Sequence, residues 1–276
     1  MHNLNAIITI AFRDVSKLFR DRPRILASLI FPVIFIGVLG TSLQSNLGDN
    51  LGFNFLVFVF IGVIAQTLFQ STASGIISLV EDRQNDFAQE MFIAPISRYS
   101  ILLGKILGET LISIVQIVGV LVFGFIMGIP LDIPALIRLI PFVFAVSFFG
   151  GAFGVMVMSS LSNQRAANQI FPFILFPQFF LAGVFNPISN LPLPILVASR
   201  LSPMTYAVDL LRSVYYLGNP EYSKTVLFNP LINLSVVLGA GLVFLVIGTF
   251  LFVKKRTKSL KLLWRFCNFY SNFEYN

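Results

Sequence analysis

Long uncharged runs separated by short polar segments are the main pattern along the chain. Six uncharged windows are long, at 25–48, 50–80, 110–131, 139–164, 166–199 and 225–253. A helix needs about 20 apolar residues to cross the hydrocarbon core of a bilayer, and each window reaches that length. The windows are continuous Leu, Ile, Val and Phe runs rather than the alternating strands of about 10 residues that build a membrane barrel. The pattern therefore predicts six transmembrane helices in an all-α membrane protein.

The predicted helices occupy most of the chain. We place the spans at about 25–45, 53–80, 101–127, 139–161, 167–185 and 229–253. Pro32 in the first span and Pro172 and Pro177 in the fifth are expected to kink these helices in a way that aids packing. Four glycines have the spacing typical of close helix packing: Gly124 with Gly128, and Gly150 with Gly154.

The segment before the first span has an amphipathic pattern of its own. Apolar residues recur there at helical spacing: Leu4, Ile7, Ile8, Ala11, Phe12, Val15, Leu18 and Phe19. Arg13, Lys17 and Arg20 fall on another face, as in helices that lie in the plane of the membrane interface. We expect an N-terminal interfacial helix, which either anchors the chain passively or joins a cytoplasmic partner to the first span.

The composition supports a membrane protein and excludes most enzyme classes. Of the residues, 56% are hydrophobic and 11% charged, whereas a soluble domain is about 45–50% apolar and about 25% charged. The charged residues are too few to cover a soluble surface. Acid–base or metal catalysis needs clustered His, Cys, Asp or Glu, and the chain has one histidine, His2, and one cysteine, Cys267. We expect no enzymatic activity, no bound metal and no cofactor.

The distribution of basic residues predicts the orientation in the membrane. With six spans, 15 of the 19 Lys and Arg residues fall in the terminal segments and in the loops on the same side as the termini. Cytoplasmic loops are enriched in Lys and Arg, so both termini are placed in the cytoplasm or its equivalent. The net charge of +7 therefore reflects topology. A nucleic-acid partner is not expected, because the sequence shows no soluble basic face with stacking aromatics.

The loop after the second predicted span, residues 81–100, is amphipathic rather than simply polar. It opens with charged residues and continues with a short helical pattern that ends at Pro95. Such a helix docks with its apolar side in a groove of another protein. We predict a short cytoplasmic helix that docks on a partner, called the coupling helix here, with Asp86, Phe87, Glu90, Met91, Pro95 and Arg98 as its contact residues.

Two further sites are expected at opposite ends of the spans. Lys105 and Glu109, one helical turn apart at the start of the third span, are interpreted as a charge pair at the cytoplasmic entrance. Residues 186–212 are too apolar for an ordinary outer loop and are broken by Pro and Gly, which favours a re-entrant hairpin before the last span. Asp209 and Arg212 lie at helical spacing there, and a structural ion pair is favoured over contact with a substrate.

The loop at 81–100 and the hairpin segment at 186–212 resemble those of the ABC-2 type permeases, the membrane subunits of ATP-binding-cassette exporters. Residues 201–212 match the Pro-x-Thr-Tyr-Ala-x-Asp-x-x-Arg signature of that family, and residues 94–98 with 103–105 match its first cytoplasmic loop. Residues 86–89 depart from the Gly-Thr-Leu-Glu found in many relatives. The residues carried over for the outer motif are Pro203, Thr205, Tyr206, Asp209 and Arg212. The resemblance covers one ABC-2 type transmembrane domain over 1–256, and leaves a basic and aromatic tail at 257–276.

The resemblance implies a division of labour with other subunits. A separate ABC ATPase subunit binds and hydrolyses ATP and moves the permease through the coupling helix, and the chain has no phosphate-binding Gly-x-x-x-x-Gly-Lys-Ser/Thr motif of its own. A six-span chain is half of a pathway, so a second permease chain is expected among membrane lipids. A homodimer is expected first, with a heterodimer with a similar chain as the alternative. The Phe-rich composition is similar to that of plastid-encoded algal permeases and cyanobacterial members, so a chloroplast membrane is expected, with a bacterial inner membrane as the alternative. An ATP-independent transporter or channel is the other function considered, and the substrate is not indicated.

Overall fold

The computed structural model describes residues 2–45, 52–79, 97–161, 164–188 and 191–273. Within these ranges the chain is helical and forms no strand. The elements are α1 (His2–Arg20), α2 (Arg22–Ile34), the π-helical segment η1 (Phe35–Gly40), α4 (Phe55–Gly75), α7 (Arg98–Ile126), α8 (Ile133–Ser159), α9 (Gln164–Leu181), α10 (Leu193–Leu201), α11 (Pro203–Tyr215), α12 (Tyr222–Thr225) and α13 (Pro230–Phe273). The helical class predicted from the sequence is confirmed.

Five helices in the described part of the chain are long and apolar enough to cross a membrane. They run over Ile25–Ser45, Phe55–Leu79, Tyr99–Ile126, Ile133–Ser159 and Tyr222–Leu251. The fifth predicted span corresponds to α9, which does not meet this standard because it starts with Gln164 and Arg165 and ends at Leu181. It also contains Pro172 and Pro177, as expected. Six crossings therefore remain a prediction.

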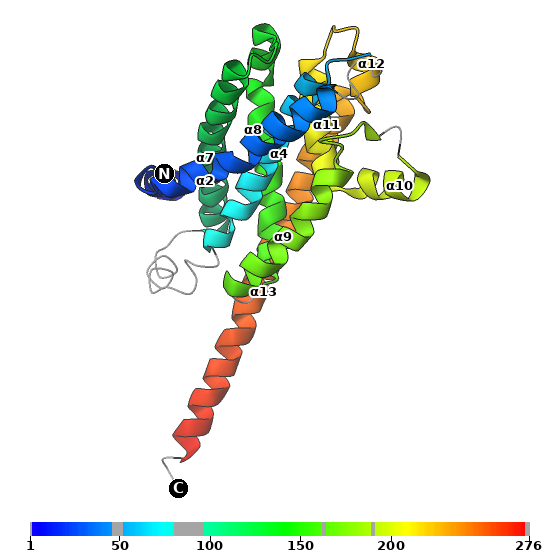
Figure 1. Cartoon of the computed structure of the whole chain (residues 1–276). Coiled ribbons are helices and arrows are strands. Elements are labelled where there is room, and N and C mark those ends of the chain that lie inside the picture. The colour runs from blue at the N-terminus through cyan, green and yellow to red at the C-terminus, as the bar shows by residue number, and fades with distance from the viewer. Residues whose placement is uncertain (1, 46–51, 80–96, 162–163, 189–190, 274–276) are drawn as a thin grey trace.

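Helix α4 is the centre of the bundle, packed by α7, α8 and α11, while α13 packs along α8 (Figure 1). Of the apolar window of α4, 78% is buried, against 17% for the first span. Phe69 of α4 contacts the rings of Phe149 and Phe153 on α8, and Phe244 of α13 contacts the same two rings. This aromatic cluster holds the three helices together.

Glycines set the closest approaches between helices. A side chain at Gly150 would collide with Phe69 and Thr72 of α4, and one at Gly154 would collide with the backbone of Ala73. The predicted packing role of this pair is confirmed. In the other pair, Gly124 lies against Phe60, but Gly128 adopts a left-handed φ of 68° with open space around it. The packing role predicted for Gly128 is wrong, because this residue forms the turn that ends α7.

Helix α1 packs on the first half of α7. Gly104 and Gly108 of α7 are one turn apart and let the α1 backbone approach, with Ala11 Cα 3.2 Å from where a Cβ on Gly108 would lie. The apolar positions predicted as one face divide into two: Ala11 and Leu18 are buried, together with Ile10, which was not among those positions, whereas another row stays exposed. The exposed row consists of Leu4, Ile8, Phe12 and Phe19. This row is free to meet lipid.

Two features of the chain depart from straight single spans. The first span changes to the π-helical segment η1 just after Pro32, a common response to a disturbed hydrogen-bond ladder. Helix α13 continues past the predicted end of the last span to Phe273, and its last part extends away from the other helices (Figure 1). The predicted tail over 257–273 is thus helical and continuous with the last span.

Candidate functional site

The signature motif lies on α11, which is buried at the end of the bundle where α13 begins. Asp209 accepts hydrogen bonds from the backbone N–H groups of Leu227 and Phe228, both at 2.9 Å, and from Asn233 Nδ2 at 2.7 Å. Burial raises the pKa of the Asp209 carboxyl, and these donors act in the opposite direction by stabilising the charged form. Asp209 therefore fixes the start of α13 and the connection that precedes it. Sequence reasoning missed Asn233, a fully buried amide.

Arg212 binds a different part of the fold. Its guanidinium donates to the carbonyl oxygens of Gly183 at 2.8 Å, Val184 at 3.0 Å and Phe58 at 3.2 Å. The guanidinium carbon also lies 3.4 Å from the ring centroid of Phe58, a cation–π contact. Gly62 leaves the space for this, because a Cβ there would lie 2.6 Å from Arg212 Nη2. Arg212 thus clamps the turn after α9 onto α4.

Asp209 and Arg212 form no direct salt bridge within the described part of the chain, although their opposite charges attract each other. The two side chains satisfy separate partners on separate elements, although they lie on one helix. The other motif residues are also structural: Pro203 occupies the first turn of α11, and Thr205 Oγ1 donates to Ser199 O at 2.6 Å. Tyr206 donates its hydroxyl hydrogen to Arg200 O at 2.9 Å. The motif joins α9, α10, α11 and α13 rather than forming a site for chemistry.

Buried charges lie at the opposite end, where residues 80–96 connect α4 to α7. Lys105, 1% exposed, is 3.0 Å from Asp14 of α1 and donates to the hydroxyl of Ser78 at 2.9 Å. Glu109 is buried one turn further along α7, with its carboxyl against Gly75. Sequence reasoning missed Asp14 as a partner of Lys105. The predicted pair of Lys105 with Glu109 stays a prediction. This cluster ties α1, α4 and α7 together.

The predicted coupling helix cannot be placed. Asp86, Phe87, Glu90, Met91 and Pro95 lie outside the described residues. Arg98 is the first residue of α7, and its side chain is outside the described part as well. No group of three or more His, Cys, Asp or Glu that would hold a metal ion occurs in the described ranges, and the expected absence of a cofactor stays a prediction.

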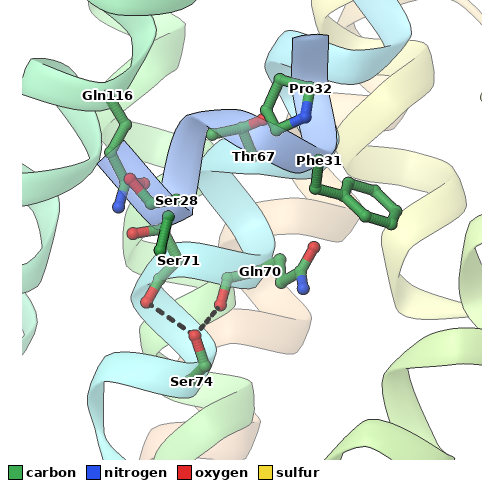
Figure 2. Close-up of a pocket in the computed structure, with 9 residues that line it drawn as sticks. Ser28, Phe31, Pro32, Thr67, Gln70, Ser71, Ser74 and Gln116 are labelled. Carbon is green, nitrogen blue, oxygen red and sulfur yellow. Dashed lines mark hydrogen bonds between the residues drawn. The ribbon is translucent and has the colours of Figure 1, made fainter. Parts of the chain in front are cut away.

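A polar cleft of about 300 Å³ lies between α2, α4 and α7 at the depth of the spans. Figure 2 shows the side chains of Ser28, Ser71 and Gln116, from three different helices, around the same space. Six hydrogen-bonding side chains line the cleft: Ser28, Thr67, Gln70, Ser71, Ser74 and Gln116. Polar groups within membrane helices are costly and usually face the bundle interior or a water-filled cavity. This cleft is therefore the best candidate for a functional site.

A second, aromatic cleft of about 330 Å³ adjoins the polar one between α2, α4 and α9. The two clefts share Phe31, Gln70 and Ser74. The remainder of the second lining is mostly apolar, with Phe171, Leu175, Phe176 and Phe179 of α9 among its members. Both volumes lie in the range of small-molecule sites, about 300–1,000 Å³. Together the clefts form a groove with a polar and an apolar section.

Sequence reasoning missed the polar cleft. One signal was present, since Thr67, Gln70, Ser71 and Ser74 recur at spacings that place them on one side of a helix. Ser28 and Gln116 come from other spans and carry no such pattern. Their convergence is visible only in the packed bundle.

The fold and the cleft define a multi-pass helical membrane protein with a polar groove among its spans. Residues 5–216 match the ABC-2 type transporter family, and the chain belongs to that family. It is 26% identical over 257 residues to a putative transport permease ycf38 of Cyanophora paradoxa, covering 89% of this chain and 88% of that protein. The protein of the same description from Pyropia yezoensis is 25% identical, covering 82% and 78%. A probable multidrug ABC transporter permease YbhR of Escherichia coli is 23% identical, covering 58% and 43%.

Proposed function

We propose that the chain is the permease subunit of an ABC exporter and moves substrate with ATP hydrolysed by a separate nucleotide-binding subunit. The family match over residues 5–216 carries the proposal. Two supporting observations are the five long apolar helices of the described chain and the relatives that are named transport permeases. The absence of a phosphate-binding motif from the sequence requires that ATP be bound elsewhere.

In this proposal the chain crosses the membrane six times, with α9 as the fifth crossing. Arg165 in the polar first turn of α9 is exposed, which suits the end of a crossing at the membrane surface. Gln178, deeper in α9, is already bonded within the protein and donates to Ile174 O at 3.1 Å. Helices α10 and α11 form the outer re-entrant hairpin. The exposed apolar row of α1 lies in the lipid interface, on the side that the basic residues assign to the stroma or cytoplasm.

A second copy of the chain completes the pathway. The polar cleft is lined in part by α2, a helix that is mostly unburied in one chain. Lipid tails cannot satisfy hydroxyl and amide groups, so a homodimer that shields these groups is favoured over a lipid-exposed monomer. We propose a plastid membrane as the compartment, because the ycf38 relatives from Cyanophora paradoxa and Pyropia yezoensis are permeases of algal plastids. A bacterial inner membrane is the alternative.

Co-purification from native membranes tests the proposal. We expect the tagged full-length chain, extracted in mild detergent, to bring down an ABC ATPase that hydrolyses ATP. Met91→Asp in the predicted coupling helix should abolish this association, because a carboxylate would have to enter an apolar groove. Leu217→Asp, an exposed position at the outer end, is the matched control and should leave it intact. Transport by the purified chain alone, with no ATPase bound, would favour the ATP-independent alternative.

A further inference from the structure

The polar cleft contains hydrogen-bonding groups that the protein leaves unused. Gln116 is 9% exposed and lines the cleft, and its amide forms no hydrogen bond with any residue of the described chain. The amide is not among the fully buried polar groups of the described chain, so it borders the space of the cleft and is suited to a partner that enters there. Gln70 and Ser71 also line the cleft, and their side chains form no hydrogen bond within the described chain. The dashed lines that reach them in Figure 2 are bonds from the Ser74 hydroxyl to their backbone carbonyl oxygens.

The lining is polar but uncharged. None of the residues that line the polar cleft or the adjoining aromatic cleft is Asp, Glu, Lys, Arg or His. A charged group brought into such a site would lose its hydration and find no counter-charge, which is strongly unfavourable. Amide and hydroxyl groups each donate and accept. The cleft therefore matches a group of the same kind, with hydroxyl or amide functions and no net charge.

The polar cleft lies nearer to one end of the bundle than to the other. Ser74 lies one turn before Ser78, which bonds to Lys105 at the end of the bundle where residues 80–96 connect α4 to α7. The polar cleft is thus in the half of the bundle near that connection. The aromatic cleft adjoins the polar cleft, because Phe31 lines both. A ligand whose polar group lies in the polar cleft would therefore find apolar surface beside it for its remaining part.

We propose that the polar cleft binds the uncharged, hydroxyl- or amide-bearing head of an amphipathic molecule, with Gln116 as the central hydrogen-bonding group. The apolar part of the molecule lies against Phe171 and Phe176 in the aromatic cleft. The inference rests on the proposed function, since this molecule would be the transported substrate. It specifies the chemistry of that substrate, which the family membership leaves open.

Photolabelling of the full-length chain in lipid nanodiscs tests the proposal without an ATPase. The probe is an alkyl maltoside with a diazirine on the first alkyl carbon, compared with an alkyl phosphate and an alkyl trimethylammonium of the same chain length. We expect the maltoside to label peptides that contain Ser28 and Gln116, and unlabelled maltoside to compete. The two charged probes should label these peptides on the order of tenfold less, because their heads would be desolvated without a partner.

Paired variants separate binding from folding. Thr67→Val removes a hydroxyl inside the cleft without changing the side-chain shape, and Thr249→Val makes the same change on α13, where Thr249 bonds to Leu245 O. Thr67→Val and Gln116→Leu should each lower maltoside labelling by about fivefold, the factor that corresponds to one hydrogen bond. Thr249→Val should leave it unchanged, and all three proteins should elute as one symmetrical peak in gel filtration.

Three results would overturn the proposal. The first is equal labelling by neutral and charged probes, and the second is labelling that Thr67→Val and Gln116→Leu do not reduce. The third is a disulfide between two Ser28→Cys chains in place of any labelling, which would show that a second copy fills the cleft. The proposed function is tested separately. Loss of cleft labelling with an ABC ATPase still bound would refute only the inference, whereas labelling in a chain that never binds an ATPase would refute only the proposed function.

Discussion

Replacing Arg212 by methionine is predicted to destabilise the outer end of the bundle strongly. The side chain is 4% exposed and donates to three carbonyl oxygens, two of which, on Gly183 and Val184, lie in the irregular turn after α9. Each buried carbonyl left without its donor costs about 1–3 kcal/mol, so two of them give roughly 4 kcal/mol. For a chain of this size that corresponds to a fall in Tm on the order of 10 °C.

Thermal unfolding of the purified protein in detergent, followed by gel filtration after heating, measures this effect. Arg212→Lys should fall between the wild type and Arg212→Met, because an ammonium keeps the charge but cannot reach all three carbonyls in the fixed geometry of a guanidinium. Arg200→Met is the matched control, since Arg200 is exposed on α10, and its Tm should stay within about 1 °C of the wild type. Equal Tm values for the Arg212→Met and Arg200→Met proteins would refute the clamp.

Two further substitutions test packing and the buried charges by the same unfolding assay. Gly154→Ala places a methyl group against the Ala73 backbone and should lower the free energy of unfolding by about 1–3 kcal/mol. Gly239→Ala, the control, has open space around it and should be neutral or stabilising. Similar free energies of unfolding for the two variants would argue against close α4–α8 packing. Lys105→Met removes the ammonium 3.0 Å from Asp14 Oδ2 but leaves Arg13 bonded to Asp14 Oδ1. It should therefore cost less than the roughly 3–5 kcal/mol of a fully unpaired buried charge, and adding Asp14→Leu should recover part of that loss. No recovery would mean that the pair is not coupled.

The spans could be predicted because each is a long apolar run between charges. The limit of that reasoning is α9, whose window in the sequence extends to residue 199, while the helix ends at Leu181. The turn around Gly183, with a left-handed φ of 70°, ends it there. Arg212 holds that turn from a distance in sequence that no local pattern reveals.

The roles of the site residues were harder to predict than the helices. Asp209 and Arg212 are three residues apart and so lie on the same side of a helix. On the surface of a protein this spacing predicts an ion pair. Because α11 is buried among α4, α8 and α13, each side chain meets another neighbour first. The polar cleft likewise depends on how Ser28 and Gln116 are brought to α4 by packing, and a single sequence carries no signal for such contacts.

Transport in proteoliposomes tests the central claim most directly. The full-length chain is reconstituted with its co-purified ABC ATPase, and movement of a fluorescent alkyl maltoside between the leaflets is followed with and without ATP. The proposal predicts movement that requires ATP and stops when the ATPase carries a substitution that blocks hydrolysis. Equal movement without ATP, or with the chain alone, would contradict a permease driven by a separate nucleotide-binding subunit.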